Sequence, residues 1–86
     1  MNATEQKASE ILTWIVERRI ALLSAHQLIE QDLAAVSEHL WEAARRCDDP
    51  TRETLCQEQR RLERGLDEVE REQYQLQLLH AGVDSV

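Results

Sequence analysis

The chain has 86 residues, of which 42% are hydrophobic, 31% charged and 3% aromatic, and its formal net charge is −7. This length allows one domain with a thin core, which needs very regular packing, a staple or a partner. The negative charge disfavours nucleic acid and anionic membranes as partners, and no apolar run approaches the roughly 18–20 residues of a membrane span. Because no secretory signal opens the sequence, we expect a cytoplasmic protein.

A seven-residue repeat of apolar positions runs through the first half of the chain. Twelve positions, here called the seam, alternate spacings of four and three residues, and only Arg19 and His26 among them are neither apolar nor cysteine. This pattern predicts one helix over about residues 3–47, roughly 65 Å long at about 1.5 Å per residue. The seam comprises Ala8, Leu12, Ile15, Arg19, Leu22, His26, Ile29, Leu33, Val36, Leu40, Ala43 and Cys47.

Several large apolar residues of the same stretch lie off the seam, and one partner helix cannot cover them all. Either they form one broad face of a compact bundle, or a second chain covers them, and the second interpretation is favoured. Both tryptophans belong to this set, and tryptophan is enriched among interface hot spots. The predicted partner-binding residues are Ile11, Trp14, Ile20, Leu23, Leu28 and Trp41.

The only proline of the chain marks a corner between two long helical segments. Asp48 and Asp49 supply capping side chains, and Pro50 suits the first turn of a new helix because that turn does not need its N–H group. The residue before a proline disfavours helical geometry, so the first helix is predicted to stop by about residue 48. The corner is therefore placed at residues 48–50.

The second segment continues the seven-residue spacing with a more polar seam. Leu55, Leu62, Val69 and Leu76 recur every seven residues. Gly82 is a natural helix stop, so the helix is predicted over about residues 50–80, with a frayed tail at 81–86. The positions interleaved on this seam are Gln59, Leu66, Gln73 and His80.

Together these elements predict an all-α fold, an antiparallel two-helix hairpin forming one domain over residues 1–86 and completed by a partner chain or by dimerisation. Folding about Asp49 sets Val36 opposite Leu62 and Ile29 opposite Val69, and a register displaced by one turn is equally allowed. In both registers roughly the first 18 residues overhang the second helix. The predicted core is Ile15, Leu22, Ile29, Leu33, Val36, Leu40, Leu55, Leu62, Leu66, Val69 and Leu76.

The sequence offers few groups for catalysis or metal binding. His26, His39 and His80 with Cys47 and Cys56 make no known ligand spacing, so no metal and no cofactor are expected. The two cysteines are expected to be free thiols. The prediction is a protein without enzymatic activity.

The stretch LTWIVERRIALLSAHQLIE, residues 12–30, resembles the long first helix of small all-helical chorismate mutases. That resemblance would imply a dicarboxylate site held by several converging cations. Arg18 and Arg19 stand near acidic neighbours, and the later arginines alternate with glutamates. A mutase is therefore kept only as a minor alternative.

The stretch DDPTRETLCQEQRRLERGLDEV, residues 48–69, resembles the second helix of the small E-type co-chaperones of the type III secretion needle. The shared features are a polar corner, a Gln-rich helix start and a Leu-Glu-x-x-Leu patch, here Leu62 to Leu66 with Leu55 before it. The resemblance implies a virulence-associated protein that binds a helical-repeat chaperone and helps keep the needle subunit soluble.

Two functional classes follow from the sequence. The favoured class is a chaperone or co-chaperone that binds a helical chaperone or a secretion substrate by helix–helix packing, and the alternative is a self-assembling homodimeric coiled-coil adaptor. In both cases the partner is a protein.

Overall fold

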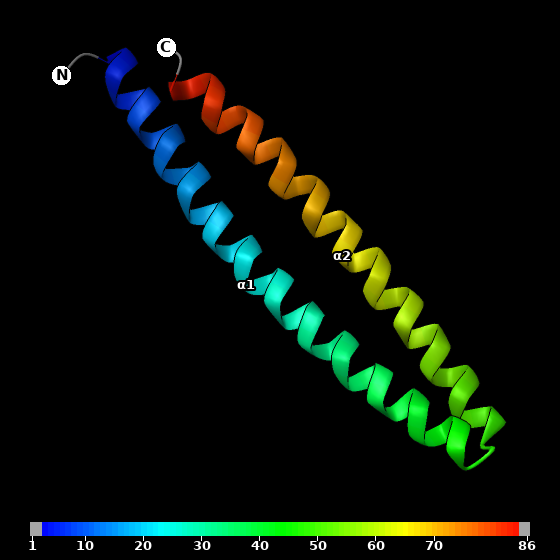
Figure 1. Ribbon diagram of the computed structural model, residues 1–86. Coiled ribbons are helices and arrows are strands. Elements are labelled where there is room, and N and C mark those ends of the chain that lie inside the picture. Colours follow the sequence, from blue (N-terminus) through cyan, green and yellow to red (C-terminus); the bar gives the residue numbers. More distant parts are fainter. Residues whose placement is uncertain (1–2, 85–86) are drawn as a thin grey trace.

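The computed structural model describes residues 3–84, and these form two long helices joined by a tight corner. Helix α1 spans Ala3–Arg45 and helix α2 spans Asp49–Asp84. The helices lie side by side in opposite directions, so that both ends of the chain lie at the same end of the molecule (Figure 1). The Cα atoms extend over 67 × 15 × 15 Å. The prediction of an all-α antiparallel hairpin is confirmed, with no strand among residues 3–84.

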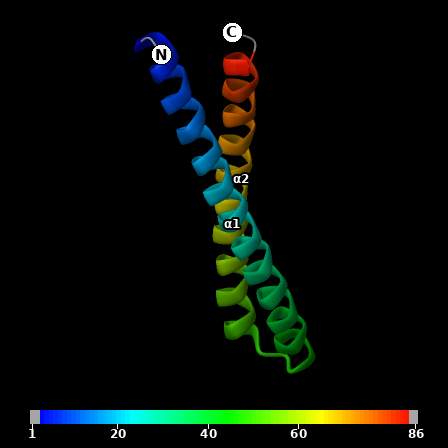
Figure 2. The ribbon, with the colours of Figure 1, turned by 90° about the vertical axis from the view of Figure 1, so that its left-hand side faces the viewer.

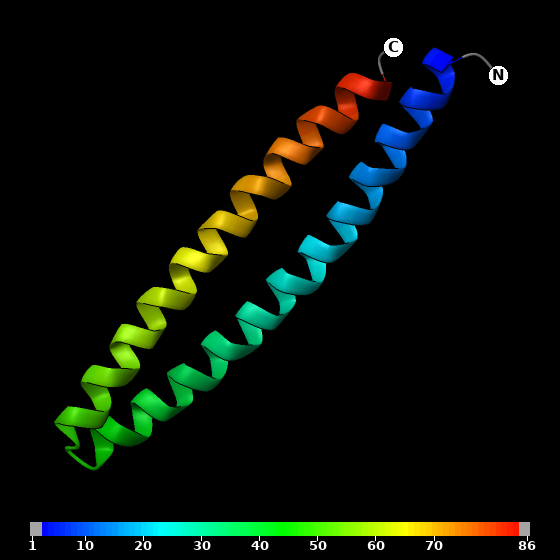
Figure 3. The same cartoon turned by 180° about the vertical axis from the view of Figure 1, so that it is seen from behind.

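The two helices cross at a shallow angle, which is visible when the molecule is turned by 90° (Figure 2). The view from behind shows the two helices side by side over most of their length (Figure 3). A strict seven-residue apolar repeat has this effect, because an ideal helix drifts by about 20° per heptad and must supercoil to keep one line facing its partner. The heptad pattern of the sequence therefore accounts for the geometry of the pair.

Burial follows the seam closely. Between residues 12 and 43, every seam position is buried or half-buried, and only Ala25 and Ser37 join them from outside the seam. On α2, the seam positions from Leu55 to His80 are likewise buried or half-buried. The most buried side chains are Ile15, Leu22, Val36, Ala43, Leu62 and Leu76, with exposed fractions of 1% to 9%. Of the other predicted core residues, Ile29, Leu33, Leu40, Leu55, Leu66 and Val69 are half-buried.

The corner closes with a specific hydrogen-bond pattern. The backbone N–H of Asp48 donates to the carbonyl of Ala43 at 3.0 Å, and that of Cys47 donates to the carbonyl of Ala44 at 3.2 Å. Cys47 has a φ of 55°. A left-handed residue with these two bonds is a Schellman motif. It ends α1 at Arg45, two residues before the predicted end at residue 47.

The beginning of α2 is capped by Asp48, because its Oδ1 accepts a hydrogen bond from the N–H of Thr51 at 3.3 Å. The predicted end of α2 near residue 80 is wrong. The helix continues through Gly82. Val83 is half-buried in line with the seam, and this burial outweighs the weak helical preference of glycine. Residues 85 and 86 of the predicted frayed tail lie outside the described residues.

The predicted overhang of about 18 residues is also wrong. Ile15 is only 1% exposed, and Arg19 donates a hydrogen bond to Nδ1 of His80 at 2.8 Å. A Cβ added at Gly65 would lie 3.7 Å from Cδ1 of Ile29. Ile29 thus lies about one turn from its first predicted neighbour, Val69, which corresponds to the displaced register. Because of this shift and the longer α2, only residues 3–11 are exposed throughout.

Candidate functional site

Ten large apolar side chains of the described part of the chain remain exposed, although the seam between the helices is buried or half-buried. Eight of them lie in residues 11–23 or 74–79, in the half of the molecule that contains the chain ends, whereas Leu28 lies just past the middle of α1 and Trp41 lies near the corner. Scattered exposed apolar residues are ordinary, but a concentration of them marks an interaction surface. They are Ile11, Trp14, Val16, Ile20, Leu23, Leu28, Trp41, Tyr74, Leu78 and Leu79, exposed by 41% to 72%.

All six residues that the sequence predicted to bind a partner are in this exposed set, but they do not share one face. At about 100° per residue, Ile11, Trp14 and Leu28 lie on one flank of the α1 seam. Ile20, Leu23 and Trp41 lie on the other flank, on the opposite side of the helix from the first group. A single flat partner therefore cannot cover all six.

Ion pairs show which flank of α2 accompanies each flank of α1. Arg18 forms a bidentate pair with Glu72, with its Nε and Nη2 atoms donating at 2.9 and 3.1 Å. Ile11 and Ala25 lie seven residues before and after Arg18, and Leu79 lies seven residues after Glu72. We call this side the Trp14 face, made of Ile11, Trp14, Arg18, Ala21, Ala25, Leu28 and Ala35 on α1 with Glu72, Leu79 and Gly82 on α2.

The opposite side is marked by His26, whose Nδ1 lies 3.5 Å from Glu30 and whose Nε2 lies 3.3 Å from Glu70. Leu23 lies seven residues before Glu30, and Tyr74 lies one helical turn after Glu70. We call this side the Ile20 face, made of Val16, Ile20, Leu23, Ala34 and Trp41 on α1 with Tyr74 on α2. The hairpin thus has two apolar faces that point in opposite directions.

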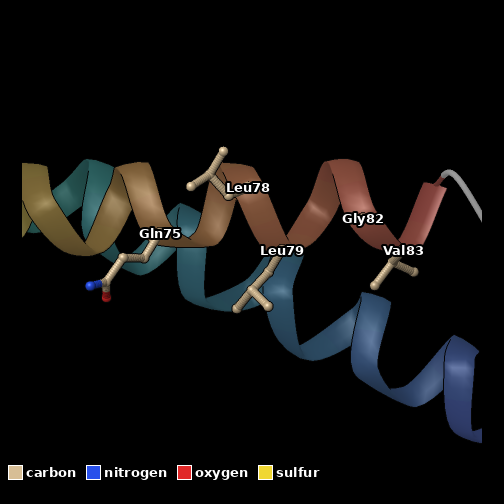
Figure 4. Close-up of a pocket in the computed structure, with 5 residues that line it drawn as sticks. All are labelled: Gln75, Leu78, Leu79, Gly82 and Val83. Carbon is tan, nitrogen blue, oxygen red and sulfur yellow. The ribbon is translucent and has the colours of Figure 1, made fainter.

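A shallow apolar hollow lies at the end of α2 (Figure 4). It forms because Gly82 carries no side chain, and a Cβ placed there would have no atom within 4 Å. Leu78 and Leu79 point to different sides of α2 around it. The hollow is open, with only apolar carbon and one amide, Gln75, around it, and it therefore extends the apolar surface rather than forming a pocket for chemistry.

Near the corner, Trp41 borders a second shallow groove between the helices, together with Leu40, Ala44 and Cys56. Cys47 is exposed and Cys56 is half-buried, and both are free thiols, as predicted. Trp41 is 72% exposed, the largest fraction among the large apolar residues. The Ile20 face therefore has an apolar contact close to the corner as well.

The groups that might serve a catalytic site are engaged within the hairpin. The guanidinium of Arg18 is paired with Glu72, and that of Arg19 donates to His80. Within residues 3–84, no three His, Cys, Asp or Glu side chains come together in a way that could hold a metal ion. In that same range, neither helix has a stretch apolar enough to cross a membrane.

The separation into two faces was missed by the sequence reasoning, although the signal was present in the spacing. Ile11 to Trp14 is three residues and Trp14 to Leu28 is fourteen, whereas Trp14 to Ile20 is six, which is far from any multiple of a helical turn. The chain matches no protein-family model, and no curated protein or solved structure is significantly similar to it.

Proposed function

We propose that this chain is a non-enzymatic binding protein that packs its exposed apolar surface against helices of another protein. The observation that supports this most directly is the exposure of ten large apolar side chains among the described residues, eight of them in one half of a hairpin whose seam is already buried or half-buried. A monomer rarely exposes contiguous apolar patches above a few hundred Å². Such a surface gains free energy when a partner covers it.

The Ile20 face is the proposed site for that partner. Ile20, Leu23 and Tyr74 are 59% to 63% exposed and come from both helices, so they form a surface two helices wide. Glu30 and Glu70 stand at its edge beside His26. An amphipathic helix with an apolar stripe and basic flanking residues would complement this arrangement.

The secretion co-chaperone role is the specific form of this proposal. It rests on the resemblance of residues 48–69, and the fold is compatible with it. The corner is short and polar, and the patch from Leu62 to Leu66 lies against α1, with Leu62 7% exposed and Leu66 half-buried. In this role the protein would bind a helical-repeat chaperone and help keep a needle subunit unpolymerised in the bacterial cytoplasm.

The test is affinity capture with matched surface variants of the tagged full-length chain from a lysate of the source bacterium. Leu23→Glu removes a 63% exposed apolar side chain and adds a charge. Gln27→Glu adds the same charge one turn away, at an exposed polar position of the same face. A stoichiometric partner should be retained by wild type and by Gln27→Glu, and should lose at least tenfold in affinity with Leu23→Glu.

Mass spectrometry of the captured protein then tests the specific role. A helical-repeat chaperone or a needle subunit would support it, whereas a partner unrelated to secretion would refute the co-chaperone role and leave the binding function intact. If no protein depends on Leu23, the binding function itself is refuted.

A further inference from the structure

The Trp14 face contains a regular line of exposed residues at seven-residue spacing along α1. Because burial on α1 keeps the seven-residue period, residues seven apart keep the same orientation relative to α2. From its N-terminal end, the line begins with a positive charge, continues with alternating large and small apolar side chains, and ends with a negative charge. Its members are Lys7, Trp14, Ala21, Leu28, Ala35 and Glu42.

This line is complementary to itself when it is reversed. Set antiparallel against a second copy, Trp14 faces Ala35 of the second copy, and Leu28 faces Ala21 of the second copy. Large side chains opposite small ones allow two helix surfaces to approach closely. At the ends Lys7, the only lysine of the chain, meets Glu42 of the second copy.

We propose that two copies of this chain associate antiparallel through their Trp14 faces and form a four-helix assembly. The two-fold axis passes close to Ala25, so that each Ala25 lies beside its counterpart. A two-fold interface places the same patch of each copy against the other, and the line from Lys7 to Glu42 satisfies that condition. Trp14 and Leu28, exposed by 55% and 61% in the single hairpin, become covered.

The charge of the Trp14 face is compatible with self-association. Arg18 and Glu72 neutralise each other through their bidentate pair, which leaves Glu68 of α2 as the exposed carboxylate at the level of the axis, where it faces one carboxylate of the second copy. On the Ile20 face, by contrast, Glu30 and Glu70 would be brought toward the same two carboxylates of another copy. Self-association is therefore assigned to the Trp14 face.

The antiparallel orientation is favoured over the parallel one by the residues that would face each other. In a parallel pair, α1 of one copy lies over α2 of the other, at the levels set by the contact between Ile29 and Gly65. Leu28 would then lie against Glu68 of the second copy, and an apolar side chain would desolvate a carboxylate. The antiparallel pair avoids this contact.

The available area is sufficient for a stable dimer. From Lys7 to Glu42 the face is about 50 Å long, and two helices side by side are about 20 Å wide. The product, roughly 1,000 Å² for each copy, exceeds the approximately 800 Å² per partner that a standard interface buries. Dimerisation leaves the Ile20 face of each copy free for a different protein, so this inference goes beyond the proposed function and does not depend on it.

Cysteine cross-linking of the full chain tests the position of the axis. In a Cys47→Ser/Cys56→Ser background, Ala25→Cys should give a disulfide-linked dimer on mild oxidation, because the two thiols lie next to each other at the axis. Ala34→Cys, at an exposed alanine of the Ile20 face, is the matched control and should form no disulfide-linked dimer under the same conditions. Circular dichroism checks that both variants keep the helicity of the parent.

Charge reversal tests the orientation independently, with sedimentation as the readout. Lys7→Glu and Glu42→Lys should each weaken dimerisation roughly tenfold, because each turns two attractive contacts into like-charge contacts. The double variant should restore it, since the pairs re-form with reversed signs. Spin labels on Cys47, with Cys56→Ser, should lie about 66 Å apart, because each is 22 residues of about 1.5 Å from the axis.

Three results would overturn the proposal. A chain that stays monomeric at all accessible concentrations would exclude the dimer. Cross-linking of Ala34→Cys instead of Ala25→Cys would show that the interface lies on the Ile20 face and not on the Trp14 face. A Cys47 label separation below about 25 Å excludes the antiparallel orientation. None of these results affects capture of a partner through Leu23, so the two proposals fail separately.

Discussion

Cys47, at the corner between the helices, has a backbone conformation that glycine adopts more easily. This leads to a quantitative prediction about stability. Its φ of 55° is in the left-handed region, where an L-residue suffers a clash between Cβ and the following carbonyl oxygen. The position corresponds to the residue after the helix cap, which is most often glycine. Cys47→Gly should therefore stabilise the hairpin.

The size of the effect follows from two opposing contributions. Removing the side chain relieves about 1–2 kcal/mol of left-handed strain. The added freedom of glycine in the unfolded chain costs about 0.5–1 kcal/mol. The net gain is about 0.5–1 kcal/mol, which corresponds to roughly 2–8 °C in Tm for a domain of this size. Thermal unfolding followed at 222 nm, at one fixed concentration under reducing conditions, measures it.

The matched control is Cys47→Ala, which removes the thiol and keeps the Cβ. It should unfold within about 1 °C of wild type, whereas Cys47→Gly should unfold at a clearly higher temperature. Equal gains for both variants would show that the thiol, and not the backbone conformation, is the unfavourable feature. A loss of stability in Cys47→Gly would refute the reasoning from the Schellman motif.

Three further predictions concern the core, the helix interior and the cap, and an exposed tryptophan serves as the control for the core. Leu76→Ala should destabilise the chain by about 2–4 kcal/mol in denaturant titrations because Leu76 is 3% exposed, whereas Trp14→Ala, 55% exposed, should change the stability of a dilute monomer by less than about 0.5 kcal/mol. Gly65→Ala should stabilise α2 by about 0.5–1 kcal/mol, since the new Cβ makes an ordinary 3.7 Å contact, and a loss of stability would mean that Ile29 cannot accept it. The hydrogen bonds from the Thr51 side chain and backbone N–H hold the pKa of Asp48 below its usual value, so Asp48 stabilises the fold above about pH 4 and loses this effect as the pH falls through its lowered pKa. Asp48→Ala should accordingly lower Tm at pH 7 and leave it unchanged near pH 2, and an equal drop at both pH values would contradict this.

The seven-residue spacing of the seam was sufficient to predict the fold, because in a two-helix molecule one line of contact decides the architecture. Every seam residue from Leu12 to Ala43 is buried or half-buried. The ends of the helices were predicted less accurately from the sequence. Gly82 is a helix stop in most contexts, and the half-burial of Val83 just beyond it is an effect of tertiary structure that local sequence preferences do not include.

The register was beyond the reach of the apolar pattern alone. A seven-residue repeat fits its partner equally well in registers displaced by a turn, so the position of Ile29 beside Gly65 could not be derived from spacing. The same uncertainty produced the incorrect overhang. The exposed residues were predictable one by one, because they lie off the seam, but their division into two faces required the angular position of each relative to α2.

The polar residues of the seam explain how the hairpin keeps one register despite this ambiguity. Arg19 reaches Nδ1 of His80 at 2.8 Å, and His26 lies between Glu30 and Glu70. A slip of seven residues would move Arg19 about 10 Å from His80 and leave a half-buried guanidinium without that contact, whereas apolar pairs would tolerate the slip. Polar groups on a seam are a known means of fixing register at a cost in stability.

The cost in stability is visible in the core. Because several seam positions are polar, only six side chains of the described residues are well buried. The large apolar residues then lie on the two outer faces, where burial depends on association, and we therefore expect the stability of the chain to rise with the occupancy of those faces.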